Sequence, residues 1–343
     1  MKPNLLFEHL LAKQDLSSEQ MQEVIHACMS GLYNDIQIAT FLALMRMKGE
    51  TANELTAAAK VMQQLAHPID LGNNLIDIVG TGGDGKNTFN VSTACSFVVA
   101  ATGTPVAKHG NRSVSSRSGS ADLLEQAGFV LNLSDQQMQT CLQECNLAFL
   151  FAPSYHPAMQ HARTARQQLG IRTLFNLLGP LVNPARVKKQ VVGVFSTTWL
   201  KPLASVLANL GSEHALVISS DDGLDEISIS APTKVVEYKN GQFSEWAIKP
   251  ADYGIHHRSL EEIIVESPNQ SLEMIQSVFS GEPGAARDMV LLNSAAAIYC
   301  AHENLSFAQA LEQAKMAIDG GKAAECFNQL RQLTQNLGRS AFH

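Results

Sequence analysis

The chain has 343 residues, of which 45% are hydrophobic and 17% charged, and its formal net charge is −7 at pH 7. This length is enough to bury a large core and predicts two lobes. The acidic balance argues against a nucleic-acid surface, which needs a basic face, but it does not exclude a local basic pocket. Six scattered cysteines without a C-x-x-C pair indicate reduced thiols, as in the cytoplasm. The N-terminus does not resemble a signal peptide and no run of 18 apolar residues occurs, so we expect no membrane partner.

Residues 1–67 predict helices only. Ser17 and Thr51 are each followed three positions later by Gln or Glu, which is the capping-box pattern of a helix start. Asn34 offers a third N-cap. The expected helix ends are marked by Gly31, Gly49 and Pro68. We therefore expect a small all-helical domain over residues 1–67, completed by helices around residues 157–188.

From residue 68 onward, strand-like and helix-like segments alternate. Strands are expected at residues 75–79, 104–107, 148–151, 190–195, 215–219 and 234–238. Helices are expected at residues 91–102, 120–127, 158–169 and 200–210, and in most of the chain after residue 272. This alternation predicts an α/β fold, in which residues 68–343 form a large domain with a mostly parallel central sheet flanked by helices. The Asn240-Gly241 pair predicts a hairpin, so one strand pair near the end should be antiparallel.

A glycine-rich polar loop follows the first expected strand and reads G-T-G-G-D-G-K-N-T-F-N-V-S-T from Gly80 to Thr93. Its glycines permit backbone conformations closed to other residues and let a ligand approach the main chain. Asn90 and Ser92 open the next helix, whose N-terminal N–H groups favour an anion. The string matches neither a P-loop nor the dinucleotide-binding G-x-G-x-x-G. A plain tight turn is the alternative interpretation.

A second polar loop follows the next expected strand and reads K-H-G-N-R-S-V-S-S-R-S-G-S from Lys108 to Ser120. Such a charged run is usually a solvated face. However, a solvated face does not need this many glycines and serines between a strand and a helix. Because ligands of open α/β sheets collect beyond the carboxyl ends of the strands, the two loops together predict a site for a ligand with several phosphates.

An acidic turn, D-D-G-L-D-E, follows the expected strand at 215–219. Its adjacent Asp225 and Glu226 are hard oxygen ligands, and Mg²⁺ typically takes one or two carboxylates and completes its shell with substrate phosphates. On spacing alone, an exposed polar turn explains the acids equally well. Arg166, on a basic helix that starts near His156, would suit a carboxylate. From pattern alone, a surface arginine is the simpler interpretation.

Six ordered motifs carry a family resemblance. They are G-T-G-G-D-G with T-F-N-V-S-T, K-H-G-N-R-S-V-S-S, S-G-S-A-D-L-L-E, F-A-P-S-Y-H-P-A-M, R-T-L-F-N-L-L-G-P-L-V-N-P and D-G-L-D-E-I-S. The chain resembles the anthranilate phosphoribosyltransferases along essentially its whole length. Two small departures are Arg117, where a lysine is common, and Ser219-Ser220, where His-Gly is frequent.

The resemblance implies transfer of a phosphoribosyl group from phosphoribosyl pyrophosphate to anthranilate, an early step toward tryptophan. It also implies a homodimer, two Mg²⁺ ions per subunit, and a fold shared with pyrimidine nucleoside phosphorylases. The large domain would bind the donor. The chemistry would rely on positioning by Lys108, Asn111 and Arg166 rather than on a single catalytic side chain.

The resemblance also implies roles residue by residue. The donor would contact Gly80, Gly83, Asp84, Thr88, Asn90, Val91, Ser92, Thr93, Lys108, His109, Gly110, Asn111, Arg112, Ser113, Val114, Ser115, Ser116 and Ser120. Anthranilate would be bound by Gly80, Asn111 and Arg166, with Arg166 on its carboxylate, and its access path would be shaped by Tyr155, His156 and Pro180. Mg²⁺ would be held by Ser92, Asp225 and Glu226.

Two other functions compete with this one. A nucleoside phosphorylase of the same fold would use phosphate and a nucleoside, but it has no need of paired Mg²⁺ ligands. A non-catalytic relative that binds nucleic acid would need a basic surface, which the net charge of −7 does not supply.

Overall fold

Four helices form the N-terminal region, as the sequence predicts. They are α1 (Pro3–Leu11), α2 (Ser18–Met29), α3 (Asp35–Lys48) and α4 (Ala52–Leu65). The expected capping boxes form at Ser17, Asn34 and Thr51, where the side chain of each accepts the N–H of the residue three positions later. The structure is a computed structural model that describes residues 1–113 and 118–340. The predicted donor contacts Val114, Ser115 and Ser116, together with Arg117, lie outside these residues.

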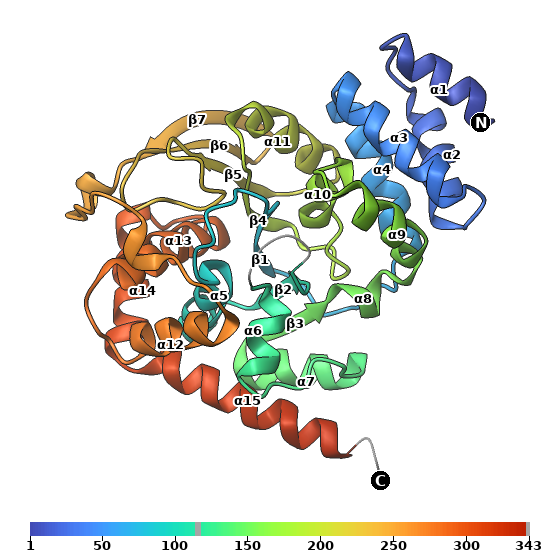
Figure 1. The fold of residues 1–343 in the computed structure, drawn as a ribbon. Helices are drawn as coiled ribbons and strands as arrows, with labels where there is room; N and C mark the ends of the chain where they lie inside the picture. The colour runs from blue at the N-terminus through green and yellow to red at the C-terminus, as the bar shows by residue number, and fades with distance from the viewer. Residues whose placement is uncertain (114–117, 341–343) are drawn as a thin grey trace.

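The helical bundle draws on a second part of the chain. Its apolar core includes side chains of α9 (Gln160–Leu169) and α10 (Leu174–Leu178) beside those of α1 to α4. Figure 1 shows α9 and α10 between the N-terminal helices and the sheet. The N-terminus lies in this bundle, whereas α15 (Lys322–Ser340) lies at the remote end of the molecule.

A seven-stranded sheet, in the order β3-β2-β1-β4-β5-β6-β7, forms the second region. Its strands are β1 (Ile76–Gly80), β2 (Val106–Gly110), β3 (Leu147–Phe151), β4 (Lys189–Gly193), β5 (His214–Ser220), β6 (Thr233–Lys239) and β7 (Gln242–Ile248). The first five are parallel to one another, whereas β6 and β7 are antiparallel. The expected hairpin joins β6 to β7 through Asn240 and Gly241, which both have positive φ, as a type I′ turn requires. The α/β fold class is therefore confirmed.

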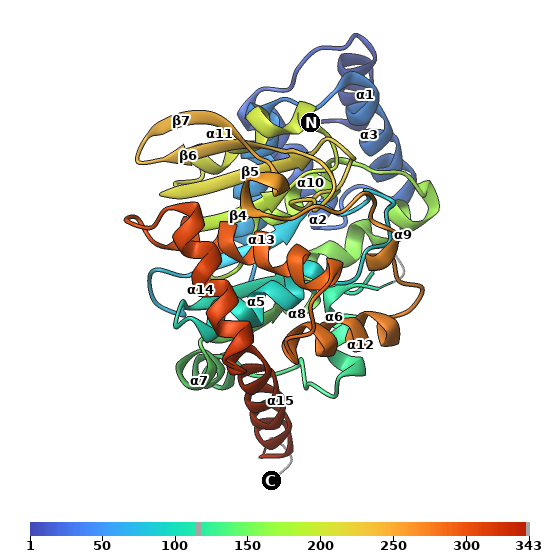
Figure 2. The same ribbon diagram turned by 90° about the vertical axis from the view of Figure 1, so that its left-hand side faces the viewer.

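Helices cover both faces of this sheet, and β5 is buried along its whole length. Leu216 and Ile218 belong to the core on one face, whereas Ala215 and Val217 belong to the core shared with the bundle. The first face is covered by α5 (Val91–Ala101), α12 (Pro268–Phe279), α13 (Ala285–Ala301), α14 (Phe307–Asp319) and α15. Figure 2 shows α5, α13 and α14 on the side of the sheet away from α1 and α3. The opposite face is covered by α11 (Leu200–Asn209).

The remaining elements are short or were not predicted. They include α6 (Ser120–Gln126), α7 (Asp135–Cys145), α8 (Ala152–Tyr155) and the 3₁₀ turns Pro157–Met159, Gly179–Leu181, Thr197–Trp199, Pro250–Tyr253 and Glu261–Ile263. The sequence does not predict α7, whereas α10 lies within residues 157–188, where helices were expected. The second strand, expected at 104–107, continues to Gly110, because Lys108 and His109 are buried within it. None of the described helices is long and apolar enough to cross a membrane.

Candidate active site

The glycine-rich loop and the acidic turn meet at the carboxyl edge of the sheet. They follow the parallel strands β1 and β5, which end at the same edge. The N–H of Gly82 donates to Asp225 Oδ2 at 2.7 Å. A Cβ on Gly80 or on Gly193 would collide with Asp225, so glycine at both strand ends lets the acidic turn lie directly on the sheet.

Lys108 joins the second loop to the first beneath this contact. It is only 3% exposed, and its Nζ donates to the carbonyl oxygen of Ile78 at 2.7 Å and to Ser92 Oγ at 3.2 Å. Burial lowers the pKa of Lys108, and Asp77 in β1 opposes that shift. The carboxylate of Asp77 accepts the N–H of His109 at 3.2 Å and Nδ2 of Asn183 at 2.8 Å. The amino group of Lys108 is therefore fixed under the start of α5.

Three carboxyl groups lie together at the edge. Burial raises the pKa of Asp225 to about 7, and the nearby charge of Asp84 adds to the increase. Burial also raises the pKa of Glu226 well above its usual value, and the charges of Asp225 and Asp84 raise it further. Within the described residues, Oε2 of Glu226 is buried and has no hydrogen-bond partner. A buried carboxylate without a partner is costly, and a cation would relieve that cost.

These residues fit Mg²⁺. The ion is a hard cation that binds through one or two carboxylates and keeps positions for water and phosphate oxygens. The backbone N–H of Ser92 contributes to the environment of Glu226, which brings the third predicted ligand to the same place. In the part of the chain that the structure describes, no group of three or more His, Cys, Asp or Glu side chains forms a ready metal site.

Arg166 provides a cation that the protein itself does not neutralise. It is half-buried in α9, and its guanidinium carbon lies 5.4 Å from the centre of the Phe175 ring. Burial lowers the pKa of Arg166, and no carboxylate of residues 1–113 or 118–340 forms an ion pair with it. An arginine in this state is suited to binding the carboxylate of a ligand. The geometry thus favours a binding role over the simpler surface interpretation.

Arg172 is a further cation at this edge, and it is not among the predicted site residues. Its guanidinium carbon lies 4.4 Å from the centre of the Phe195 ring, and a Cβ on Gly83 would lie 2.8 Å from its Nε. Its carbonyl oxygen accepts Nη1 of Arg46 in α3 at 2.8 Å. Its charge favours the ionised forms of Asp84 and Asp225. Arg172 thus connects the helical bundle to the glycine-rich loop, a relation that only the tertiary fold creates.

The second loop uses part of its polarity internally. Arg112 forms two hydrogen bonds to the carboxylate of Glu125, at 3.1 and 2.5 Å, and lies 4.7 Å from the centre of the Phe151 ring. The carbonyl oxygen of Asn111 accepts Ser120 Oγ at 3.3 Å. The N–H of Ser113 donates to Asp122 at 2.8 Å. A Cβ on Gly110 would collide with Ser120 and Phe149, so the loop leaves the strand in close contact with α6.

Two neutral histidine rings lie side by side near the edge. The rings of His109 and His156 are 5.2 Å apart, and both side chains are buried. Burial lowers the pKa of His109 to about 3 and also lowers that of His156. Neither nitrogen of His156 has a hydrogen-bond partner within the described residues. Tyr155 instead stacks on His67 at 6.1 Å, whereas Pro180 is buried and accepts Nε2 of Gln190 at 2.9 Å.

The remaining predicted donor contacts flank α5. Thr88 forms an isolated bridge with Ile264. Val91 and Thr93 are buried, so a ligand would meet their main chain rather than their side chains. The N–H of Lys86 donates to Asp84 at 3.2 Å, which closes a turn in the glycine-rich loop.

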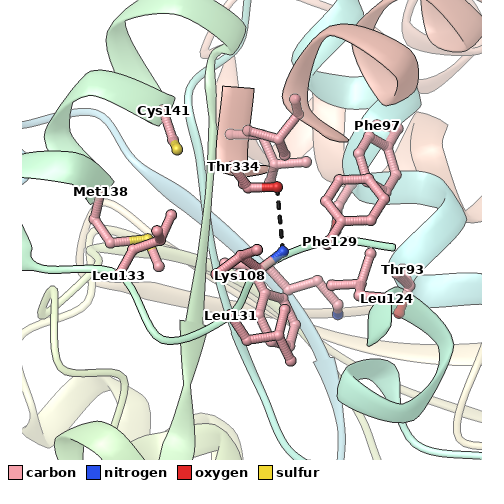
Figure 3. A pocket seen from close by; sticks show the side chains of 15 residues that line it. Thr93, Phe97, Lys108, Leu124, Phe129, Leu131, Leu133, Met138, Cys141 and Thr334 are labelled. Carbon is pink, nitrogen blue, oxygen red and sulfur yellow. Dashed lines mark hydrogen bonds between the residues drawn. The ribbon is translucent and has the colours of Figure 1, made fainter. Parts of the chain in front are cut away.

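An internal cavity lies behind Lys108 and Thr93 (Figure 3). Its volume of about 20 Å³ is close to that of one water molecule, and its lining is mostly apolar. Thr334 of α15 closes one side, where its Oγ1 accepts the N–H of Val130 at 3.3 Å.

A groove of about 510 Å³ lies beside α12, and its acidic lining includes Glu262, Glu266, Glu273 and Glu282. The cavity is too small for the donor, and the acidic groove is unsuited to a polyphosphate.

Comparison with known families covers nearly the whole chain. Residues 5–66 match the profile described as "Glycosyl transferase family, helical bundle domain", and residues 72–324 match "Glycosyl transferase family, a/b domain". An anthranilate phosphoribosyltransferase of Legionella pneumophila (strain Paris) is 75% identical over 343 residues, with 100% of both chains covered. A second one, of Thioalkalivibrio sulfidiphilus, is 50% identical over 321 residues, which are 93% of this chain and 95% of that protein.

Solved structures agree with these relatives. The anthranilate phosphoribosyltransferase of Thermus thermophilus superposes with a TM-score of 0.89 at 36% identity, over 96% of this chain and 99% of that one. The enzyme of Saccharomyces cerevisiae, in complex with phosphoribosyl pyrophosphate and Mg, has a TM-score of 0.88 at 26% identity. That match covers 97% of this chain and 98% of the yeast chain.

Proposed function

The chain belongs to the anthranilate phosphoribosyltransferases, and we propose how its residues carry out their reaction. It transfers the 5-phosphoribosyl group from phosphoribosyl pyrophosphate to the amine of anthranilate. The products are N-(5′-phosphoribosyl)-anthranilate and pyrophosphate, in L-tryptophan biosynthesis. Because relatives this similar match the chain over nearly its full length, neither a nucleoside phosphorylase nor a nucleic-acid-binding protein is supported. The observation that carries our site assignment is the contact of Gly82 with Asp225, next to the buried Oε2 of Glu226, which has no hydrogen-bond partner within the described residues.

The donor would lie across the carboxyl edge. Main-chain N–H groups of the glycine-rich loop and the start of α5 would bind its phosphates, and the buried ammonium of Lys108 would add positive charge from below. Asn111 and the serines of the second loop would hold the other end of the donor. Arg112 would contribute mainly by fixing this loop, because its guanidinium is paired with Glu125.

Asp225, Glu226 and Ser92 would hold Mg²⁺. The bound ion supplies charge neutralisation for the pyrophosphate as it leaves. We propose two ions per subunit, as the family resemblance implies. Equilibrium dialysis in the presence of the donor would count them.

The acceptor would bind on the bundle side of the edge. Arg166 would pair with its carboxylate, Asn111 and Gly80 would position it, and the neutral rings of His109 and His156 would supply an uncharged wall for its approach. Pro180 is part of the same loop region. The aryl amine is uncharged at neutral pH and its lone pair is free. The N–C bond can therefore form as the bond to pyrophosphate breaks, without a strong general base, and the amine loses its proton afterwards.

A homodimer is supported by the surface of the helical bundle. Five large apolar side chains are strongly exposed on or beside α1 to α3: Leu5, Leu11, Leu32, Ile36 and Met47. We place the bundle domain at residues 1–67 together with α9 and α10. Light scattering of Leu32→Glu with Ile36→Glu would show monomers if this face is the interface.

The six buried free thiols support a reducing, cytoplasmic location.

The reaction can be tested directly with purified protein. Anthranilate is fluorescent, so its signal should decay when phosphoribosyl pyrophosphate and Mg²⁺ are both present and should persist with EDTA. A decay that EDTA does not block would contradict the role of the metal. A folded protein that produces no decay with the donor, but consumes a nucleoside with phosphate, would contradict the function.

A further inference from the structure

Asn90 connects the two loops of the proposed donor site. It stands at the N-cap position of α5, but its side chain makes no capping hydrogen bond. Instead, its Nδ2 donates to the carbonyl oxygen of Ser118 at 3.2 Å, and its Oδ1 accepts Ser118 Oγ at 2.8 Å. A carbonyl oxygen can only accept, so Ser118 determines which side of the amide carries the nitrogen. The end of the first loop is thereby fixed to the second loop.

A residue of α12 contacts Asn90 twice. Ser271 Oγ donates to Asn90 Oδ1 at 2.8 Å and accepts the backbone N–H of Asn90 at 2.9 Å. Ser271 is 0% exposed, and its own N–H is bonded to the carbonyl oxygen of Ser267 at 3.1 Å. Its hydroxyl is therefore held in the first turn of α12 and aimed at Asn90.

The segment that leads into α12 is fixed to the same loop. The N–H of Phe89 donates to the carbonyl oxygen of Ile263 at 3.0 Å, and the N–H of Val265 donates to that of Asn87 at 2.9 Å. These two hydrogen bonds flank the bridge between Thr88 and Ile264. Residues 263–271 therefore pack along residues 87–90 and hold them in place. Ser271 provides the side-chain contact at the end of this segment.

We infer that Ser271 is a positioning residue for the phosphoribosyl donor. It keeps the side chain of Asn90 turned away from the N–H of Thr93, which an N-cap side chain would otherwise bond, whereas the N–H groups of Val91 and Ser92 already contact Phe89 and Glu226. It also supports the amide orientation that Ser118 determines and that joins the two loops. Without Ser271, only the two hydrogen bonds to Ser118 hold the side chain of Asn90, and its rotation onto its own helix would compete with the donor. This inference rests on the proposed donor site.

Steady-state kinetics of Ser271→Ala would test the inference. Loss of both hydrogen bonds should raise the KM for phosphoribosyl pyrophosphate about tenfold and leave the KM for anthranilate unchanged. Ser271→Thr keeps the hydroxyl and should restore most of the donor affinity. Ser277→Ala is the matched control on the same helix, because its hydroxyl donates to Glu282 at 2.6 Å rather than to the loop, and it should behave as wild type.

Two further measurements separate the possible failures. If Asn90→Ala leaves the donor KM unchanged, the donor site at Asn90 is misassigned and the inference falls with it. If Asn90→Ala weakens donor binding and Ser271→Ala does not, only the inference is overturned. A Ser271→Ala variant with a lower melting temperature and equal increases in both KM values would show a merely structural role, which also overturns it. Calorimetric titration of the donor gives the same answer where a variant is too slow for kinetics.

Discussion

Two buried glutamates near opposite ends of β5 are held in opposite ways. Near its start, the carboxylate of Glu237 contacts His214 Nε2 and accepts Tyr299 Oη and Trp246 Nε1, each at 2.8 Å. Burial raises the pKa of Glu237, but these partners outweigh that effect and lower the pKa below its usual value. Beyond its end, Glu226 is also buried, but its Oε2 has no partner within the described residues and its pKa is raised.

The difference separates a structural carboxylate from a binding one. A buried polar group whose partners are all supplied by the protein holds the fold together. A buried carboxylate that the fold leaves unsatisfied costs stability, and a ligand that satisfies it recovers that cost on binding. The sheet therefore has a stabilising end and a functional end, and substitutions at the two ends should have opposite effects on stability and activity.

The largest effect is expected from Asp225→Asn combined with Glu226→Gln. Loss of both carboxylates should raise the KM for phosphoribosyl pyrophosphate about 100-fold or more at fixed Mg²⁺. The melting temperature should stay the same or rise, because like charges no longer oppose each other in a buried place. Kinetics and differential scanning calorimetry check both parts. Asp221→Asn, at an exposed acid of the same turn, is the control, and a wild-type KM in the double variant would refute the assignment.

Glu237→Gln should show the reverse pattern. Because the amide cannot satisfy all of the donors around it, the free energy of unfolding should fall by about 2–3 kcal/mol. The activity of the folded variant should not change. Urea unfolding measures the first quantity, and Glu245→Gln, at an exposed ion pair on β7, serves as the control. If Glu237→Gln lowers kcat and leaves the free energy of unfolding unchanged, the two ends of the sheet do not differ in the way described.

Arg166→Ala tests whether, at the functional end of the sheet, the acceptor and the donor are bound by different residues. Loss of the guanidinium should raise the KM for anthranilate about 30-fold and leave the KM for the donor unchanged. Arg163→Ala, at an exposed position of the same helix, should have no effect on either constant. Equal changes in both KM values would mean that Arg166 supports the fold rather than the acceptor.

The smallest effect concerns pH. His109 has a native pKa of about 3, against 6.5 for the unfolded chain. Between these values the unfolded state binds more protons, so stability is complete above pH 6.5 and falls as the pH decreases, with a slope of up to about 1.4 kcal/mol per pH unit. His156 contributes in the same direction. His109→Gln should lower by about one the number of protons that the chain takes up on unfolding, and the pH dependence of stability should weaken accordingly. Urea unfolding from pH 7 to pH 4 measures this change. An unchanged slope would mean that His109 is protonated in the native state.

Local sequence signals predicted most of the fold. The capping residues Ser17, Asn34 and Thr51 act on their own helices, and Asn240-Gly241 acts on its own hairpin, so their effects need no tertiary context. The helix α7 was missed. Its Ser134 and Gln137 form a capping box, which is a local signal that could have revealed it.

The site was predictable only where it is continuous along the chain. Two loops and one turn were read from consecutive residues, and parallel topology brought them to one edge. Arg172 and Ser271 could not be found in this way. They reach the glycine-rich loop from the helical bundle and from α12, and no spacing rule links them to it. The pairing of Arg112 with Glu125 is likewise a result of how α6 packs on the loop.

Calorimetric titration of phosphoribosyl pyrophosphate into wild type and Glu226→Gln, with and without Mg²⁺, tests the account most directly. We predict that Mg²⁺ strengthens donor binding to the wild-type protein and that Glu226→Gln loses most of this gain while remaining folded. Equal Mg²⁺-dependent binding by both proteins would show that the carboxylate of Glu226 does not serve the donor, and the distinction between the two ends of the sheet would fail.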